Sequence, residues 1–287
     1  PRAAREGAVA ELHHLLRQVG PEGGVHGGAA AAQGPRAPPA VAAPLEAARV
    51  EALRQHQLLV IKEQPMSDEV LLEIGSWFGP QFVAPNGIPV LGTDEQGAVT
   101  VLSNRDEKGV GSRIALPFHT DFQFMPHPLK GAVLHAVEVP PQSAGGDTLW
   151  SNMYQALEEL PGDLREKIEG KRGTGVNPYA AGRLGAGFTG DTQKYTDEVV
   201  PDFWHPLVRT HPETGRQTLY FSMFIHHIEG YEDRPEEELE LLQALRAHVD
   251  QDHLYYRHRW NTGDTIIWDN TCTNHKRDDF DQAFDRE

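Results

Sequence analysis

Cysteine, long apolar runs and positive charge are all scarce in this chain of 287 residues. Cys272 is the only cysteine, so no disulfide can form within the chain, and we expect a reducing, cytoplasmic location. No segment reaches the roughly 18 apolar residues that cross a bilayer, and the opening residues lack the apolar run of a secretory signal, so no membrane partner is expected. The formal net charge of -16 argues against an extended phosphate-binding surface and therefore against a nucleic acid partner.

The rest of the composition is that of an ordinary globular protein, with 39% hydrophobic and 24% charged residues. Residues 5–18 carry apolar side chains at helical spacing and predict a short amphipathic helix. Residues 20–44 consist largely of Gly, Ala and Pro, which have little to bury and favour an irregular loop. We therefore predict an irregular N-terminal extension over residues 1–44 and a single compact domain over residues 45–287.

The secondary-structure pattern of the compact part changes near residue 99. Before it, residues 45–55 and the segment after Ser67 predict helices, and residues 58–61 predict a continuously apolar strand. Beyond it, short β-rich runs predict strands at residues 99–102, 131–139, 207–210, 218–222, 254–260 and 265–268. Helices are predicted at residues 154–160, 162–169 and 235–249. This order favours a mainly β fold, a closed or two-sheet core decorated by helices, over a repeating βαβ fold.

Two histidines and a carboxylate form the main candidate site. His119 and Asp121 are separated by one residue, and His275 lies far along the chain. In a strand, alternate residues point to the same face, so His119 and Asp121 can both enter the core while Thr120 points away. His275 then has to come from a neighbouring strand. Two imidazoles and one carboxylate are the ligand set of a mononuclear non-haem Fe(II) site, which leaves adjacent coordination positions open.

Several ordered blocks around these residues carry a resemblance to a known family. The blocks are FHTDFQF at residues 118–124, GGDTLW at 145–150, HPLVRTHPETGR at 205–216, YRHRW at 256–260, GDT at 263–265 and WDN at 268–270. In this order they resemble the taurine and 2,4-D dioxygenases, the TauD/TfdA family of Fe(II)- and 2-oxoglutarate-dependent enzymes, over residues 45–287. The WDN block is expected to position the strand that carries His275, with Asp269 or Asn270 as a candidate support for the metal ligands.

The resemblance implies a double-stranded β-helix, or jelly roll, in which His119, Asp121 and His275 hold a catalytic Fe(II). Thr148 and Arg286 would bind the distal carboxylate of the co-substrate 2-oxoglutarate, Arg286 through a charge-assisted contact that lysine could not copy. With O2 as the other co-substrate, family members couple oxidative decarboxylation of 2-oxoglutarate to the oxidation of a C–H bond. Relatives that halogenate carry a small residue in place of Asp121, so hydroxylation of an unactivated C–H bond in a small organic molecule is expected.

The substrate is less well defined than the reaction. Taurine-type enzymes carry a polar residue before the iron-binding motif, whereas residues 114–117 are apolar here, and Phe118 stands where tryptophan is usual. These departures suggest a less polar or larger substrate than taurine. The candidate pocket residues are Asn86, Ala115, Phe122, Phe124, Met125 and Phe224.

Three alternatives remain open. A taurine, alkylsulfonate or aryloxyalkanoate dioxygenase would use hydroxylation to cleave a carbon–heteroatom bond. A hydrolase or lyase with zinc in the same triad would act without O2 or keto acid, and it would leave Thr148 and Arg286 unexplained. A non-catalytic jelly-roll binding protein would usually have lost a ligand, and all three are present. Family members often self-associate, so a homo-oligomer is also left open.

Overall fold

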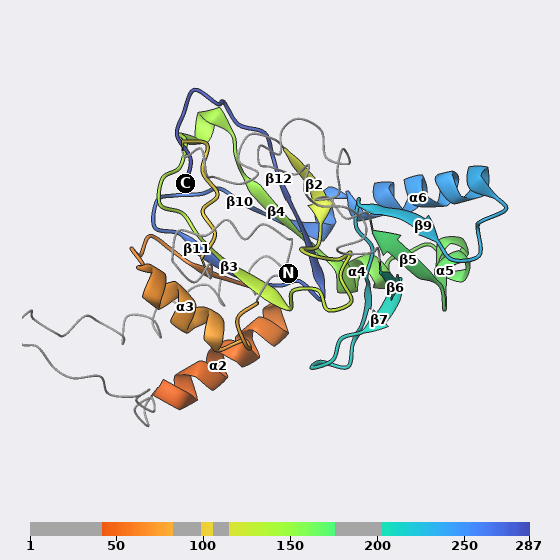
Figure 1. The fold of residues 1–287 in the computed structure, drawn as a ribbon, viewed down its shortest axis with the longest axis horizontal. Helices are drawn as coiled ribbons and strands as arrows, with labels where there is room; N and C mark the ends of the chain where they lie inside the picture. The colour runs from red at the N-terminus through yellow and green to blue at the C-terminus, as the bar shows by residue number, and fades with distance from the viewer. Residues whose placement is uncertain (1–41, 83–98, 106–114, 176–202) are drawn as a thin grey trace, which may run out of the picture.

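The computed structural model describes residues 42–82, 99–105, 115–175 and 203–287. Short strands form its centre and helices lie towards its edges (Figure 1). The helices are α2 (Ala42–His56), α3 (Asp68–Ser76), α4 (Met153–Glu158), α5 (Gly162–Ile168) and α6 (Pro235–Val249), with short 3-10 turns at η1 (Gln142–Ala144) and η3 (Asp252–Leu254). The strands are β1 (Leu58–Ile61), β2 (Leu116–His119), β3 (Gly131–His135), β4 (Thr148–Asn152), β5 (Arg172–Gly175), β6 (Trp204–Pro206), β7 (Val208–Thr210), β8 (Gln217–Leu219), β9 (Ile225–Ile228), β10 (Tyr255–His258), β11 (Thr265–Asp269) and β12 (Thr273–Arg277). Within the described ranges, no helix combines the length and the apolarity that crossing a bilayer requires.

The named strands pair antiparallel throughout. Two sheets form the main body, in the strand orders β1-β11-β3 and β10-β4-β12-β2. Two smaller sheets have the orders β6-β5-β9 and β7-β8. Strands that are distant in sequence are therefore neighbours in space, and β12 lies between β4 and β2 (Figure 1). This arrangement brings the strand of His275 next to the strand of His119.

Strands β1 and β11 are apolar along most of their length because both of their faces are covered. On one face, Leu59, Ile61 and Ile267 pack in a cluster with side chains of α2 and α3. On the other face, Ile266 packs in a second cluster that also contains Trp150 of β4. Successive residues of a strand point to opposite faces, so each strand contributes to both clusters. The second cluster joins the two main sheets.

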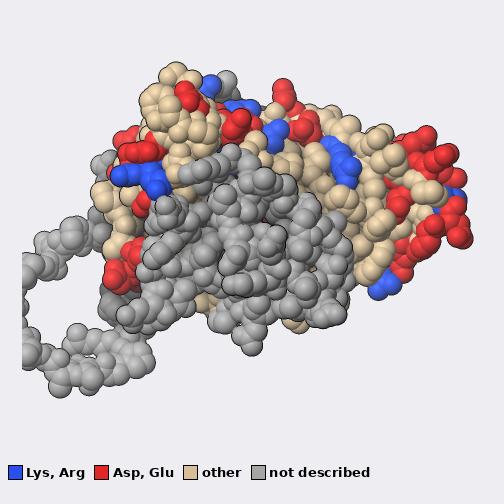
Figure 2. All heavy atoms as spheres, turned by 45° about the horizontal axis from the view of Figure 1, so that its top comes forward, with Lys and Arg blue, Asp and Glu red and all other residues tan. Residues whose placement is uncertain are grey.

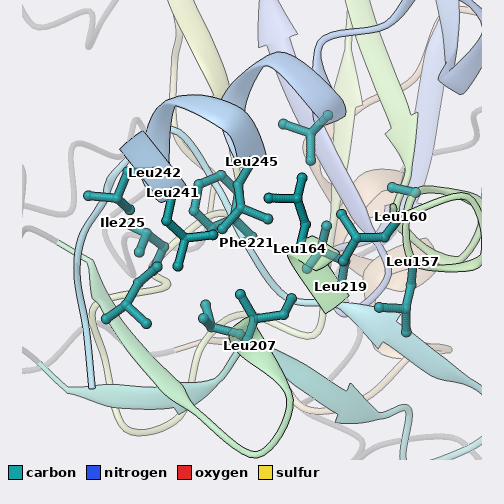
Figure 3. Close-up of a cluster of buried hydrophobic side chains, with 14 of the residues drawn as sticks. Leu157, Leu160, Leu164, Leu207, Leu219, Phe221, Ile225, Leu241, Leu242 and Leu245 are labelled. Carbon is teal, nitrogen blue, oxygen red and sulfur yellow. The ribbon is translucent and has the colours of Figure 1, made fainter. Parts of the chain in front are cut away.

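A larger hydrophobic cluster holds the helical side of the molecule together (Figure 3). Leu241, Leu242 and Leu245 of α6 are buried in it at helical spacing. Leu207, which precedes β7, and Leu219 of β8 are buried against them. The cluster therefore packs α6 against β8 and against the residue that leads into β7.

Acidic side chains gather at the end of the molecule that carries α6 (Figure 2). The first turn of α6 contains Glu236, Glu237 and Glu238, where negative charge is favourable beside a helix N-terminus. Glu236 and Glu237 are exposed, whereas Glu238 is partly buried and accepts a hydrogen bond from the backbone N–H of Ile228 at 2.7 Å. Part of the negative charge of the chain is thus concentrated at one end.

Most predicted helices and strands are confirmed, with small shifts at their ends. The helix predicted at residues 235–249 coincides with α6, and α2 begins slightly earlier than the predicted residues 45–55. The strand predicted at residues 99–102 is wrong. Thr100 makes a β-bridge, but the segment does not continue as a strand before the bend at Asn104, which is hydrogen-bonded to Phe284 and Arg286. The helix predicted at residues 5–18 lies outside the described residues.

Replacement of Leu245 by alanine is expected to destabilise the protein by about 2–5 kcal/mol, because a buried leucine leaves a cavity behind. The matched control is Leu239→Ala in the same helix, since Leu239 is 51% exposed. Its loss should change the free energy of unfolding by no more than about 0.5 kcal/mol. Urea unfolding followed by circular dichroism measures both. Equal destabilisation by the two substitutions would contradict the assigned core.

Candidate metal centre

His119 and His275 face each other across the β2–β12 pair. They are direct partners in the antiparallel register, so their side chains leave the sheet on the same face, and their ring centroids are 4.2 Å apart. Oδ1 of Asp121 is 3.6 Å from Nε2 of His119 and 3.7 Å from Nε2 of His275. One potential ligand atom from each residue lies within 4.8 Å of the others. The structure thus brings together the three residues that the sequence singled out.

Asp121 reaches this position by a route that differs from the predicted one. Strand β2 ends at His119, and Asp121 lies in the turn that follows. The turn is held by Thr120, whose buried hydroxyl donates to Oδ1 of Asn274 at 2.7 Å. Phe122 then takes a left-handed backbone conformation with a φ of 55°, which is uncommon for a residue with a side chain. The prediction that both ligands lie on one strand is therefore wrong, because the chain turns directly after the first of them.

Both histidines can offer a lone pair to a metal ion. Nδ1 of His119 lies 2.8 Å from the carbonyl oxygen of Pro117, and since a carbonyl only accepts, Nδ1 carries the proton and Nε2 is left with its lone pair. His275 is flanked by the rings of Trp150 and Trp268, with centroids at 6.4 and 5.0 Å. Burial lowers the pKa of His275 to about 3, so its imidazole is neutral near neutral pH.

The carboxylate of Asp121 is ionised and oriented by its neighbours. Burial opposes its ionisation, but His275, His119 and the amide of Asn270 hold the pKa of this carboxyl well below its usual range. Nδ2 of Asn270 donates to Oδ2 of Asp121 at 3.4 Å. The indole N–H of Trp268 donates to Oδ1 of Asn270 at 2.8 Å, which fixes the orientation of that amide. Oδ1 of Asp121 is thereby left to face the two imidazoles.

A second group of potential metal ligands, His211, Asp269 and Cys272, is fully buried, but its hydrogen bonds are already made. Nδ1 of His211 accepts the backbone N–H groups of Glu213 and Thr214 at 3.1 and 3.2 Å, so its Nε2–H donates to Asp269 at 2.9 Å. Burial raises the pKa of the Cys272 thiol, which favours its neutral form. Because His211 has no lone pair left, this cluster anchors the turn after β7 to the end of β11.

Trp260 contacts Thr148 and lines a cavity together with Arg286. The indole N–H of Trp260 donates to the buried hydroxyl oxygen of Thr148 at 2.9 Å. Since an indole only donates, the hydroxyl proton of Thr148 remains available to another acceptor. Trp260 also lines a cavity together with Gly146, Asp147 and Arg286. Trp260 therefore links Thr148 to the cavity that Arg286 lines.

Arg286 is a buried cation. Its side chain is 8% exposed, and within the part of the chain that the structure describes no carboxylate lies within ion-pair distance of its guanidinium. Burial, together with the charge of Arg277, lowers the pKa of Arg286 to about 9, so the group is still charged near neutral pH. Asn104 holds its backbone, accepting from the Arg286 N–H at 2.8 Å and donating to the Arg286 carbonyl at 3.2 Å. A buried guanidinium at the edge of a cavity suits a carboxylate ligand.

Gly145 and Gly146 allow the C-terminal segment to pack against the start of β4. Both residues have positive φ values, 85° and 88°, in the region that favours glycine. A Cβ on Gly145 would lie 2.5 Å from the carbonyl oxygen of Asp279, and a Cβ on Gly146 would lie 3.3 Å from Cβ of Phe280. The two glycines of the GGDTLW block are thus required by the close approach of the segment that ends in Arg286.

The candidate pocket residues gather only in part around the metal centre. The ring of Phe224 contacts His119 edge-on, with a centroid distance of 5.7 Å. An apolar cluster consists of Phe122, Phe124 and Met125, which lie in or directly after the turn that carries Asp121, and of Phe82 from an earlier segment. Phe122 directly follows Asp121 in the chain, so the cluster contains a residue of this turn. Ala115 is exposed just before β2, and Asn86 lies outside the described residues.

Sequence reasoning missed the residues that support this arrangement. Asn104 holds the backbone of Arg286, Trp260 contacts Thr148, and Asn274 holds the turn after β2. The sequence gives only weak pointers to two of them: Trp260 belongs to the YRHRW block, and Asn274 directly precedes the predicted ligand His275. Asn104 lies in a segment that carried no signal.

Comparison with known proteins gives the family. The family model described as taurine catabolism dioxygenase TauD, TfdA family matches residues 27–287, starting inside the segment predicted to be an irregular extension. An alpha-ketoglutarate-dependent 2,4-dichlorophenoxyacetate dioxygenase from Cupriavidus pinatubonensis is 32% identical over 249 residues, which cover 81% of this chain and 83% of that protein. A pentalenolactone F synthase from Streptomyces arenae is 31% identical over 247 residues, which cover 81% of this chain and 80% of that protein.

A solved structure has the same fold. The crystal structure of AAD-2 in complex with Mn(II) and N-oxalylglycine matches with a TM-score of 0.67 and 26% sequence identity, covering 85% of this chain and 84% of that chain. The match confirms the predicted mainly β jelly roll with helical decorations. Because the family model spans most of the sequence and named relatives exceed 30% identity over most of their own length, the chain belongs to the taurine catabolism dioxygenase TauD/TfdA family.

Proposed function

We propose that this protein is an Fe(II)- and 2-oxoglutarate-dependent dioxygenase. It couples the oxidative decarboxylation of 2-oxoglutarate, which yields succinate and CO2, to the oxidation of a C–H bond in a small organic molecule, with hydroxylation as the expected outcome. The observation that carries the proposal is the meeting of two imidazoles and one carboxylate within 4.8 Å of one another. Family membership supports the same reaction class.

The metal would be held by Nε2 of His119, Oδ1 of Asp121 and Nε2 of His275. This donor set contains no sulfur and suits Fe(II), which when bound supplies the activation of O2. The protein's own contribution is to present two imidazoles and one carboxylate in a fixed orientation. Asn270 contributes by engaging the other oxygen of Asp121. The side chain of Asp121 is 24% exposed, so water reaches its carboxylate.

The distal carboxylate of 2-oxoglutarate would be held by Arg286 and Thr148. Arg286 offers a charge-assisted fork, and Thr148 offers its hydroxyl proton because Trp260 already engages the hydroxyl oxygen. In the β12–β4 register, His275 pairs with Trp150, and Thr148 lies two residues before Trp150 on β4. Two residues of a strand span about 7 Å. A five-carbon dicarboxylate can bridge this distance.

The primary substrate is proposed to be less polar or larger than taurine. Support comes from the ring of Phe224 beside His119 and from the apolar cluster that contains Phe122. An aryloxyalkanoate fits such apolar walls, and a 2,4-dichlorophenoxyacetate dioxygenase is among the similar proteins. An alkylsulfonate dioxygenase is the alternative of the same class. A zinc hydrolase or a binding protein is disfavoured, because neither would need the buried guanidinium of Arg286.

We also propose that residues 45–287 form one catalytic domain in the cytoplasm. The single cysteine and the net charge of -16 support a reducing location and small-molecule partners, without nucleic acid or membrane partners. Self-association into a homo-oligomer is left open.

Asp121→Ala is expected to abolish the weak visible charge-transfer band that Fe(II) and 2-oxoglutarate form together under anaerobic conditions. Succinate formation should fall by more than about 100-fold. Even the substitution of residues that only support metal ligands lowers metal affinity or activity by about 10- to 100-fold. The control is Glu237→Ala, which removes an exposed carboxylate of α6. Turnover of keto acid by Asp121→Ala at the wild-type rate would refute the assigned ligand. Activity without O2 would favour the zinc alternative.

Asn270→Ala is expected to weaken Fe(II) or Mn(II) binding by about 10- to 100-fold, because Asp121 loses the donor that holds Oδ2. Trp268→Phe should give a smaller loss of the same kind, since it frees the amide of Asn270 to rotate. Metal titration of both single variants and of the double variant tests the coupling. If the losses of metal affinity in the two single variants add up in the double variant, Trp268 does not act through Asn270, and the proposed coupling is contradicted. Asn261→Ala, which removes an amide outside the metal centre, serves as the control.

Thr148→Val is expected to weaken 2-oxoglutarate binding by about 10-fold, because a hydrogen bond to a charged group is lost. Trp260→Phe should weaken 2-oxoglutarate binding as well. Without the indole N–H, the Thr148 hydroxyl is no longer held with its proton directed at the ligand. In the Thr148→Val background, Trp260→Phe should have little further effect. Calorimetric titration of the Mn(II)-loaded protein measures these affinities. Full additivity of the two losses would refute the proposed coupling.

A further inference from the structure

Arg277 lies next to the candidate co-substrate residues, although the family resemblance assigns it no role. It follows His275 by two positions on β12 and is the direct partner of Thr148 in the β12–β4 register. That pairing continues without a bulge through both positions. Alternate residues of a strand share a face, and cross-strand partners have adjacent side chains. Arg277 therefore leaves the sheet on the face that carries His275 and Thr148.

Arg277 and Arg286 converge on one aromatic ring. Cζ of Arg277 is 6.0 Å from the centroid of Phe280, and Cζ of Arg286 is 5.7 Å from it. All three side chains are buried. The charge of Arg277 reaches Arg286, where it adds to burial in lowering the pKa of that guanidinium. Two like charges thus lie within 6.0 Å of the centroid of one buried ring, and burial leaves the repulsion between them only weakly screened.

A carboxylate bound at Arg286 would offset this repulsion, and its two oxygens can accept about four hydrogen bonds, enough for two guanidinium groups and one hydroxyl. We propose that Arg277 is a second cationic contact for the distal carboxylate of 2-oxoglutarate, and that it makes the site selective for dicarboxylic 2-oxo acids. This inference rests on the proposed function. It adds a residue to the expected pair of Arg286 and Thr148.

A purely structural role for Arg277 makes a different prediction. Burial lowers the pKa of Arg277 to about 10, and the nearby charge of Asp279 opposes this shift. Phe280 packs on the guanidinium, so Arg277 could serve only to hold the C-terminal segment. Loss of such a support would weaken the binding of all 2-oxo acids alike. Loss of a direct contact would weaken only ligands that carry a distal carboxylate. The comparison of two ligands therefore separates the two roles.

The experiment uses the Mn(II)-loaded protein, so that binding is measured without turnover. Titration calorimetry compares 2-oxoglutarate with 2-oxopentanoate, which has the same chain length but no distal carboxylate. Arg277→Gln should weaken 2-oxoglutarate binding by about 10- to 100-fold, the effect of losing a charged hydrogen bond. It should change 2-oxopentanoate binding by less than about 3-fold. Arg277→Lys should bind 2-oxoglutarate with an affinity between those of the wild type and Arg277→Gln. Lysine keeps the charge but lacks the planar guanidinium that donates two parallel hydrogen bonds.

Lys276→Gln is the matched control. It removes the same charge from the neighbouring residue of β12, whose Nζ pairs with Asp250 at 2.8 Å. Mn(II) affinity, measured in every variant, checks that His275 stays in place. An unchanged affinity of Arg277→Gln for 2-oxoglutarate, or equal losses for both ligands, would overturn the inference, and Arg277→Lys carries the same comparison if the glutamine variant does not fold. Failure of the wild-type protein to bind 2-oxoglutarate would instead refute the proposed function.

Discussion

The antiparallel pairing of β12 with β2 and β4 is the constraint on which the rest of the site depends. It makes His275 the direct neighbour of His119, and it sets Arg277 opposite Thr148. Because side chains alternate along a strand, a slip of one residue would turn all of these groups to the other face. Apolar packing opposes such a slip. Trp150, the partner of His275 on β4, is buried in the cluster that joins the two main sheets.

Buried hydrogen bonds hold what this register brings together. Thr120 links the turn after β2 to Asn274, and the amide of Asn274 donates in turn to the carbonyl of Phe221 at 2.6 Å. Asn270 reaches the carboxylate of Asp121 from the connection between β11 and β12. A buried polar group left without its partner costs about 1–3 kcal/mol. The stability of the fold therefore works to keep the candidate ligands in position before any metal is bound.

The two ends of the site differ in charge, and this difference gives the proposed co-substrate one orientation. At one end, Asp121 and two imidazoles suit a divalent cation. At the other end, Arg286 and Arg277 form a buried cationic patch within a chain whose net charge is -16. Burial limits the screening of this patch by solvent, and within the described part of the chain no carboxylate lies within ion-pair distance of the Arg286 guanidinium. The GGDTLW block contributes by admitting the C-terminal segment against β4.

Local patterns in the amino-acid order, together with the family resemblance of the ordered blocks, were enough to predict the chemistry and the fold class. The types and spacing of His119 and Asp121, and the alternation of short apolar runs, depend on neighbouring residues alone. The sequence did not predict that Asp121 lies in a turn or that residues 99–102 are not a strand, and it assigned no role to Asn104 or Arg277. Each of these depends on a partner far away in the chain. Such partners become neighbours only when the strands pair and the core packs, and no local pattern encodes that meeting.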